Sequence, residues 1–279
     1  MSEPSEFLSF FKSLRLSGDV YFTAQKKDTF KYLHLQKNRK GDFMVQVQLL
    51  KKPKNATIIE GFPGFGLVGT ITTEYLLQHL KCEFIGSFWL EEMPATVVVH
   101  EGALVPPIGL YYNAAYNLVI VHAISGTIGV EWLISEYIDE VAKQIGAKEI
   151  ITIEGVGSAG ETEESQAFVY TKNPKKKEQF KKLGVKPLTE GIIIGVTSAL
   201  LLKTKIDTIA LFADTHSKLP DSKAAAKVIE VLDKYLGLKI DPKPLVETAE
   251  KFEKKLQTLI EKSKVATEEL KEKQMNYVG

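Results

Sequence analysis

The chain has 279 residues, of which 44% are hydrophobic and 25% are charged, a composition that suits one large globular domain with extensions or two small domains. With 36 Lys and Arg against 35 Asp and Glu, the net charge is +1, so overall charge provides no argument for nucleic acid or an anionic membrane as the partner. The single cysteine, Cys82, excludes an intramolecular disulfide and a thiolate metal cluster.

The beginning of the chain indicates a cytoplasmic protein. MSEPSEFLSFFKSLRL lacks the order of basic, apolar and small-residue regions that marks a signal peptide, and no apolar run approaches the roughly 20 residues that span a bilayer. Residues 1–43 contain the basic run KYLHLQKNRKGD and show no sustained periodicity. We interpret them as a loosely ordered basic extension without a membrane or nucleic-acid partner.

Residues 44–113 begin an alternation of strands and helices. MVQVQLL (44–50) alternates apolar and polar residues like a half-buried strand, and ATIIEG (56–61) is a β-branched strand. LVGTITTEYLLQHL (67–80) has helical spacing, and CEFIGSFWL (82–90) follows as a strand. The short links between the next candidates favour an antiparallel arrangement of strands at 95–102, 108–113 and 118–124.

The second half continues the same alternation. An amphipathic helix is predicted over 127–146, with Thr127 as its cap and Gly146 as its stop, followed by a strand at 148–157. Further helices are predicted at 174–184, which begins with Pro174, and at 222–238. The predicted strands between them are 167–173, GIIIG (191–195) and IDTIALFAD (206–214). Residues 44–238 therefore predict a three-layer α/β/α sandwich with a largely parallel sheet.

Residues 239–279 have the pattern of a long C-terminal helix. From Leu245 onward, apolar and small residues recur at alternating spacings of four and three, which is a heptad seam. A helix over about 242–274 would be roughly 50 Å long at 1.5 Å per residue. Two interpretations remain open: a coiled-coil contact, or a helix packed lengthwise on its own domain. The main seam residues are Leu245, Ala249, Phe252, Leu256, Leu259 and Leu270.

The stretch EGFPGFGLVG (60–69) carries a Gly-x-Gly-x-x-Gly fingerprint between a strand and a helix. In dinucleotide sites such glycines allow a tight turn and a close approach of the pyrophosphate, and an acidic residue follows about 20 positions later, where Glu91 and Glu92 stand. Two aromatic side chains and a Pro-Gly turn inside the loop favour a packed turn instead. The loop residues are Gly61, Phe62, Pro63, Gly64, Phe65, Gly66 and Gly69.

Three predicted strands end in Glu-Gly, at Glu60, Glu101 and Glu154. If the strands at 60 and 154 are parallel, their carboxylates lie at the edge where α/β folds bind ligands, and they could act as acid and base. His122 or the Asp214–His216 pair could assist. The competing interpretation is that Glu-Gly closes strands and caps helix amines. The five histidines are spread singly, so no metal site is predicted.

The segments IIEGFPGFGLVGTITTEYLLQHL, EEMPATVVVHEG, NLVIVHA, IEGVGSAG and GIIIG resemble the archaeal and actinobacterial branch of the proteasome-assembly-chaperone family over about residues 44–238. The resemblance implies a phosphorylase-like three-layer fold, a homo-oligomer, and the α-subunit ring of the 20S proteasome as the protein partner. It implies an ATP-independent, non-enzymatic chaperone or adaptor without a cofactor. The alternative is a nucleotide- or nucleoside-binding enzyme that uses the glycine loop and the strand-end carboxylates.

The resemblance also implies a role for the C-terminal tail. Proteasome-binding tails often end in a hydrophobic residue, a tyrosine and any residue, which enter pockets between α subunits. The chain ends KEKQMNYVG, so Tyr277 stands third from the end rather than second. A frayed tail with a chance tyrosine is the alternative. The residues expected to contact the ring are Met275, Tyr277, Val278 and Gly279.

Overall fold

The structure, a computed structural model, describes residues 36–37, 43–44, 49–88, 90, 92–93, 95–100, 103–157, 165–215 and 220–247. Most of the predicted N-terminal extension lies outside these residues. The predicted seam beyond Leu245 and the tail residues Met275, Tyr277, Val278 and Gly279 also lie outside them.

The strands and helices are β1 (Gln36–Lys37), β2 (Phe43–Met44), β3 (Thr57–Gly61), α2 (Val68–His79), β4 (Glu83–Ser87), β5 (Val98–His100), β6 (Ala103–Val105), β7 (Ile108–Asn113), β8 (Leu118–Ala123), α3 (Glu131–Ile145), β9 (Glu149–Gly157), β10 (Ala167–Thr171), α4 (Pro174–Lys182), β11 (Lys186–Pro187), α5 (Val196–Lys203), β12 (Thr208–Thr215), α6 (Ser222–Leu236) and α7 (Lys243–Glu247).

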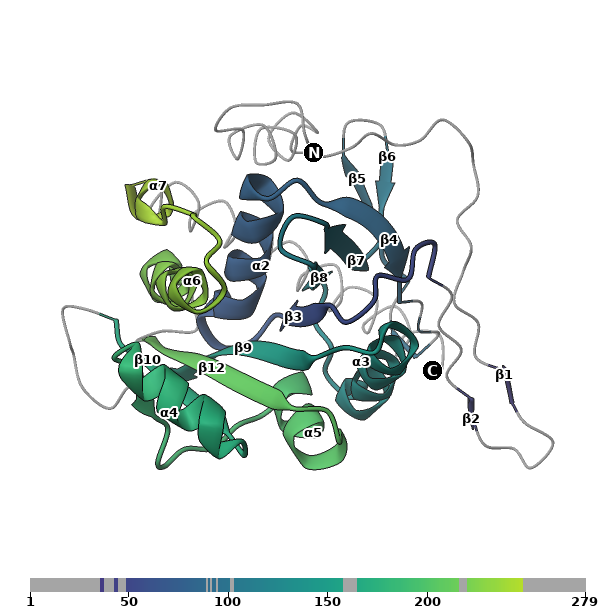
Figure 1. The fold of residues 1–279 in the computed structure, drawn as a ribbon. Helices are drawn as coiled ribbons and strands as arrows, with labels where there is room; N and C mark the ends of the chain where they lie inside the picture. The colour runs from purple at the N-terminus through teal and green to yellow at the C-terminus, as the bar shows by residue number, and fades with distance from the viewer. Residues whose placement is uncertain are drawn as a thin grey trace, which may run out of the picture.

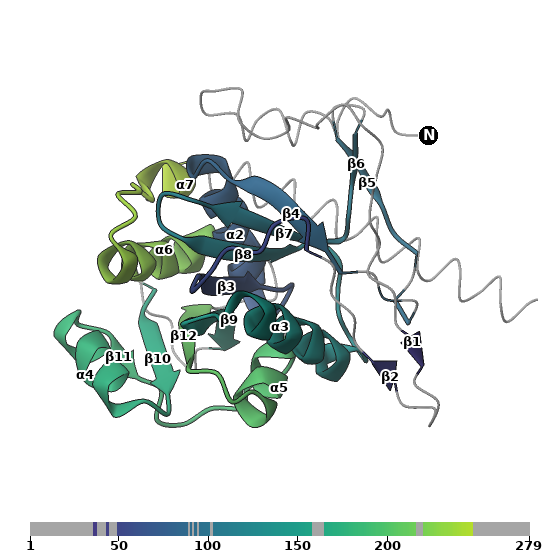
Figure 2. The ribbon, with the colours of Figure 1, turned by 45° about the vertical axis from the view of Figure 1, so that its right-hand side comes forward.

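Eight strands form the central sheet in the order β11-β10-β12-β9-β3-β8-β7-β4. The four central strands, β12, β9, β3 and β8, run parallel to one another, whereas β10, β7 and β4 pair antiparallel with β12, β8 and β7. The parallel strands are rich in apolar residues, as expected for strands whose two faces are both covered. Strands β5 and β6 form a separate antiparallel hairpin, which projects beyond the sheet in both ribbon views (Figures 1 and 2).

Helices cover both faces of the sheet, with α2 and α6 on one side and α3 and α5 on the other (Figures 1 and 2). Ile59, Ile151 and Leu211 belong to a hydrophobic cluster with residues of α2 and α6. Ile58 and Ile150 belong to a second cluster with residues of α3 and α5. Since neighbouring residues of a strand point to opposite faces, one sheet supplies both cores. The predicted three-layer α/β/α sandwich is therefore confirmed.

The helix ends follow local chemistry, with one exception. Asn173 caps α4 by accepting hydrogen bonds from the amides of Lys175 and Lys176, and α3 stops at Gly146 in the left-handed conformation. The prediction that Thr127 caps α3 is wrong. The helix begins at Glu131, and the Val130 amide donates to the Thr127 carbonyl at 3.1 Å, so Thr127 lies in a turn before the helix.

The segment GIIIG is not the buried strand that its sequence predicts. Residues 191–194 have irregular backbone outside the sheet, with Ile192 88% and Ile194 76% exposed. Gly195 follows with φ +99°, a conformation that alanine and larger residues rarely adopt, and α5 begins immediately after it. The apolar run therefore leads into a helix that the sequence pattern does not predict.

Leu245, the first residue of the predicted seam, is buried in the cluster that α2 and α6 share. Leu238 and Ile240 belong to the same cluster, and the Tyr75 hydroxyl donates to the Asp241 carbonyl at 2.7 Å. The described chain beyond α6 is thus fixed to the domain.

Candidate functional site

The glycine loop connects the end of β3 to the start of α2 at the carboxyl end of the parallel strands. It contains a short 3₁₀ turn, Phe65–Leu67, in which Gly66 and Leu67 have φ values of 64° and 51°. Leu67 precedes α2 in the left-handed conformation and provides no side-chain cap. The loop thus turns the chain sharply from strand into helix, and Gly66 supplies one of the two positive φ angles.

The other loop glycines permit backbone to pack on backbone. A Cβ atom on Gly61 would overlap the Gly69 carbonyl, and a Cβ atom on Gly69 would lie 2.7 Å from the Ile153 carbonyl oxygen of β9. Further along β9, a Cβ atom on Gly155 would overlap the Phe65 carbonyl. Strands β3 and β9, the loop and α2 therefore pack closely because glycines stand at these contacts.

Side chains of this chain occupy the remaining close approaches to the loop. A Cβ atom on Gly64 would overlap the carboxyl group of Glu154, and one on Gly66 would lie 2.7 Å from the hydroxyl oxygen of Thr215. The Gly66 carbonyl also accepts a hydrogen bond from the Asp221 amide at 2.9 Å. The glycines thus bring the loop against the ends of β9 and β12.

The two aromatic loop residues differ in their environment. Phe62 is buried in the cluster that α3 and α5 share, so its ring packs inside its own domain. Phe65 is half-buried, and its ring carbons lie 3.8 and 3.9 Å from the position of a Cβ on Gly157. Pro63 is half-buried and Gly64 is exposed, so the tip of the loop faces solvent.

Two of the three predicted strand-end carboxylates meet beneath this loop. Glu60 is opposite Thr152 in the β3–β9 register, and Glu154 follows Thr152 by two residues, so all three side chains point to the face that carries α3 and α5. The Thr152 hydroxyl lies 2.5 Å from that of Thr197 in the first turn of α5. The site therefore joins β3, β9, the glycine loop and α5.

Burial makes both carboxyl groups weak acids. It raises the pKa of Glu60 to about 8; the hydrogen bond with Thr152 opposes this rise, and the charge of Glu154 adds to it. Burial also raises the pKa of Glu154 to about 8, against hydrogen bonds from the amides of Phe65 and Gly155 and from Thr197. Perturbed carboxyl groups at the carboxyl edge of a parallel sheet are typical of ligand sites.

The other residues considered with this acid pair lie elsewhere. His122 is opposite Gly61 in the β3–β8 register and therefore points to the face that α2 covers, where Nδ1 lies 2.9 Å from Thr73 Oγ1 and Nε2 lies 3.0 Å from a Glu74 carboxylate oxygen. Asp214 accepts a hydrogen bond from the Gln166 amide. The expectation that His122 assists the glutamates is wrong. Glu101 and His216 lie outside the described residues.

The strand order contradicts a dinucleotide site of the expected kind. In that fold the strand after the glycine helix pairs with the first strand and brings an acidic residue to the ribose. Here β4, which follows α2, is separated from β3 by β8 and β7. Glu92 is exposed beyond this edge strand, and Glu91 lies outside the described residues. The fingerprint therefore predicts the turn correctly and the partner strand incorrectly.

The described part of the chain contains no group of three or more His, Cys, Asp or Glu side chains arranged to hold a metal ion. Cys82 is half-buried at the entry to β4, and burial raises the pKa of its thiol to about 12, so it remains a protonated thiol at neutral pH. The described residues therefore offer neither a metal centre nor a thiolate nucleophile.

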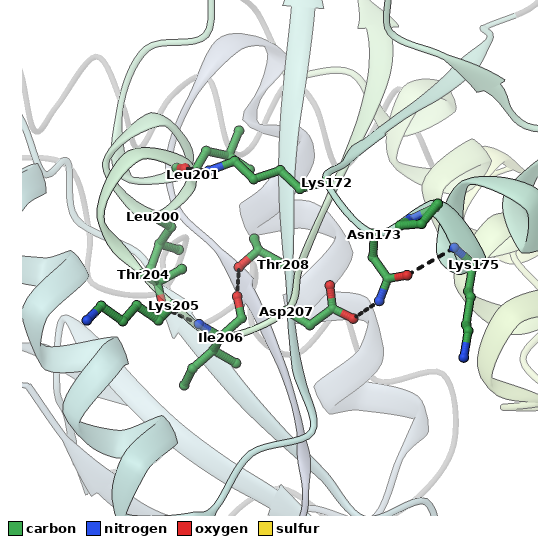
Figure 3. Close-up of a pocket in the computed structure, with 11 residues that line it drawn as sticks. Lys172, Asn173, Lys175, Leu200, Leu201, Thr204, Lys205, Ile206, Asp207 and Thr208 are labelled. Carbon is green, nitrogen blue, oxygen red and sulfur yellow. Dashed lines mark hydrogen bonds between the residues drawn. The ribbon is translucent and has the colours of Figure 1, made fainter.

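A groove of about 770 Å³ opens at the opposite edge of the sheet, between the ends of α5 and the starts of β12 and α4 (Figure 3). Its polar side chains bond to one another: Asn173 Nδ2 donates to Asp207 Oδ2 at 2.6 Å, and Lys172 Nζ donates to the Leu201 carbonyl at 2.8 Å. In Figure 3 the ammonium groups of Lys175 and Lys205 point away from each other. Lys172, Asn173 and Asp207 are thus already bonded within the protein, and this groove is not the candidate site.

The sequence pattern identifies Glu60 and Glu154 but not their threonine partners. Thr152 could have been found, because it lies two residues before Glu154 and so shares its face. Thr197 could not, because α5 itself was not predicted. Gly195 is predicted only as the end of the GIIIG strand, although a Cβ atom on it would lie 3.8 Å from a Glu154 carboxylate oxygen.

Comparisons with known proteins agree with the fold. An uncharacterized protein of Methanocaldococcus jannaschii is 28% identical over 211 residues, 75% of this chain and 87% of that protein. The crystal structure of Pyrococcus furiosus PbaA, described as an archaeal homolog of proteasome-assembly chaperone, has 30% identity and a TM-score of 0.72 over 78% of this chain and 97% of its own. A Thermoplasma acidophilum protein of unknown function has 25% identity and a TM-score of 0.70 over 79% and 92%.

The family model described as the PAC2 family matches residues 58–260, which include the glycine loop, Glu154 and the whole central sheet. The resemblance that the sequence motifs indicate is thereby confirmed. The chain belongs to the PAC2 family.

Proposed function

We propose that this protein is a cytoplasmic, homo-oligomeric chaperone or adaptor that binds the α-subunit ring of the 20S proteasome without ATP, through its C-terminal helix and tail. The observation that carries the proposal is membership of the PAC2 family, together with the 30% identity to PbaA of Pyrococcus furiosus. In the described residues, no helix is both long and apolar enough to cross a membrane.

The geometry of the glycine loop argues against a dinucleotide site. Its close approaches are taken by Glu154, Thr215 and backbone of the same chain, and the strand that would bring the acidic residue of a dinucleotide site, β4, is separated from β3 by two other strands. The carboxyl groups of Glu60 and Glu154 below the loop disfavour a bound phosphate, because an ionised carboxylate and a phosphate repel each other. The loop therefore acts as a structural element of the body that presents the tail.

Deleting residues 271–279 is expected to abolish co-elution with purified proteasome α rings and to leave the oligomer intact. A few tail residues bind weakly, but several copies facing a symmetric ring gain about 10²- to 10⁴-fold in avidity. Size-exclusion chromatography with light scattering at several salt concentrations measures both results. The matched control is Gln274→Ala, a single change inside the same segment.

Two further results decide the role of the tail. Deleting Gly279 alone makes Tyr277 the penultimate residue, and we expect tighter ring binding if the tyrosine enters a pocket between subunits. Unchanged ring binding after loss of residues 271–279 would contradict the proposed tail contact. A stable oligomer that ignores α rings would contradict the proposed function as a whole.

An exposed apolar surface at one end of the α3–α5 pair supports the homo-oligomer. Thr204 and Lys203 at the end of α5 bond to Asp139 and Glu136 of α3. Helix α3 leads into β9 and α5 leads into β12, these two strands are parallel, and both helices pack on the same face of the sheet, so the helices run in the same general direction. Their N-terminal ends therefore lie together. The isoleucine surface comprises Ile128 and Trp132 at α3 and Ile192 and Ile194 before α5. Such clustered exposure is typical of protein interfaces, and we assign it to a second copy of this chain.

The double substitution Ile192→Ser, Ile194→Ser is expected to shift the light-scattering mass toward the monomer while changing the free energy of unfolding by less than about 0.5 kcal/mol, because both side chains are exposed. The matched control is Leu202→Ser at the other end of α5, where the leucine is 74% exposed. An unchanged mass for the double variant, or an equal shift for the control, would contradict the assignment of this surface.

A further inference from the structure

The acid pair contains a carboxyl oxygen that lacks a partner. Glu60 is 1% exposed, and its Oε1 atom has no hydrogen-bond partner among the described residues. A buried oxygen in this state costs about 1–3 kcal/mol of stability relative to a bonded one. A group with that cost indicates a partner that the described residues do not supply.

The surroundings of Glu60 are rich in acceptors and poor in donors. The two glutamates bring four carboxyl oxygens, while the donors identified near them are the hydroxyls of Thr152 and Thr197 and the amides of Phe65 and Gly155. The two hydroxyls lie 2.5 Å apart, so one of their two protons is used between them. In their ionised form the two glutamates therefore leave capacity for several more N–H or O–H donors.

Positive charge is also missing. Among the described residues, no lysine, arginine or histidine forms an ion pair with Glu60 or Glu154, although six other ion pairs are formed. Two buried carboxyl groups without a cation stay protonated, whereas an added cation would stabilise their ionised form. The missing partner thus combines positive charge with several donors.

We propose that Glu60 and Glu154, with the hydroxyls of Thr152 and Thr197, bind the primary ammonium group of a small alkylamine. An ammonium group offers three N–H donors, which suit Glu60 Oε1, a Glu154 carboxylate oxygen and one threonine hydroxyl. It is a compact charge, and two carboxylates provide more than enough negative charge to balance it. This binding is independent of the proposed proteasome contact.

Other ligands fit the same atoms less well. A phosphate or carboxylate would add negative charge to an acid pair. A calcium or magnesium ion is less well suited, because only two acidic side chains meet here and no group of three or more His, Cys, Asp or Glu among the described residues is arranged to hold a metal ion. A neutral alcohol brings a single donor and no charge. The ammonium group supplies both the missing hydrogen-bond donors and the missing positive charge.

The loop tip and the start of α5 lie beside the Glu154 carboxyl group. Glu154 is partly exposed, and the backbones of exposed Gly64 and of Gly195 flank its carboxyl group without side chains to block it. An alkyl chain attached to a bound ammonium group would extend past these two glycines toward solvent.

The test is calorimetric titration of the purified full chain, alone, with n-butylammonium chloride in phosphate buffer, because Tris carries a primary amine. We expect saturable millimolar binding, with Glu60→Gln and Glu154→Gln each weakening it about tenfold or more. Glutamine preserves the shape of the side chain and removes the ionisable group. The control variant is Glu190→Gln, which changes an exposed glutamate that is not part of the acid pair.

The probes separate charge from hydrogen bonding. Butanol, which has one donor and no charge, and tetramethylammonium, which has charge and no N–H, are both expected to bind at least about tenfold more weakly. Nα-acetyl-lysine amide tests whether a lysine side chain can supply the same group; binding as strong as that of butylammonium would identify a protein lysine as a possible source. Absence of butylammonium binding to the unmodified chain, or equal binding by the Glu60→Gln variant, would overturn the proposal.

Discussion

Replacing Gly155 by alanine is expected to lower the free energy of unfolding by about 3 kcal/mol or more. Gly155 lies in the last part of β9, where a Cβ atom would overlap the Phe65 carbonyl of the glycine loop and would lie 3.1 Å from Thr215 Cγ2. Neither neighbour can easily move, because the Phe65 carbonyl belongs to the backbone of a tight turn and Thr215 is the last residue of β12. The added methyl group must therefore separate the loop from the sheet.

Urea unfolding monitored by circular dichroism measures this loss. The matched control is Gly126→Ala, since Gly126 has no atom within 4 Å of the added Cβ and no positive φ angle. We expect the control to change the free energy of unfolding by less than about 0.5 kcal/mol. If both variants unfold at the same urea concentration, the glycine at 155 does not hold loop and strand together.

The central sheet is the part of the fold that the sequence predicts best. Residues 206–214 and 148–157 each contain an apolar-rich run, and they become β12 and β9, the two long parallel strands. Such runs are informative because burial on both faces leaves few other solutions. The same logic misleads at GIIIG, where the apolar side chains remain exposed before α5. Local hydrophobicity cannot reveal that the sheet already has its full set of strands.

The glycine loop illustrates what a motif can and cannot predict. Its glycines require close packing in any fold, and the strand, turn and helix are found where the motif indicates. The identity of what packs against them depends on strand order, which places the end of β9 rather than β4 beside β3. Glu154 meets Gly64 across about 90 residues of sequence, so no local pattern contains this contact.

The acid pair is only partly predictable for the same reason. The Glu-Gly endings identify both glutamates, and the assumption of parallel strands correctly brings them to one edge. The face that each side chain takes follows from the register, which separates His122 from them. Thr197 depends on α5, whose eight residues are mostly apolar and carry no helical stripe. Tertiary packing, not propensity, determines that helix.

Glu60→Gln is expected to stabilise the protein at about pH 8 and to have little effect at about pH 5. The pKa of Glu60 is about 8 in the folded protein and near 4.5 in the unfolded chain. Between these values the folded state keeps a proton that the unfolded state releases, so the free energy of unfolding falls as pH rises, by up to about 1.4 kcal/mol per pH unit. Glutamine does not ionise and removes this contribution.

Thermal and urea unfolding across this pH range, in buffer without primary amines, measure the effect. The variant should exceed the unmodified protein by about 2 kcal/mol or more at pH 8, and Glu190→Gln should follow the unmodified protein throughout. Parallel pH profiles for Glu60→Gln and the unmodified chain would mean that Glu60 is already ionised at neutral pH. Addition of n-butylammonium should reduce the difference, because a bound cation stabilises the ionised pair only where Glu60 is present. The pH profile and the amine titration therefore probe the same orphaned oxygen by independent means.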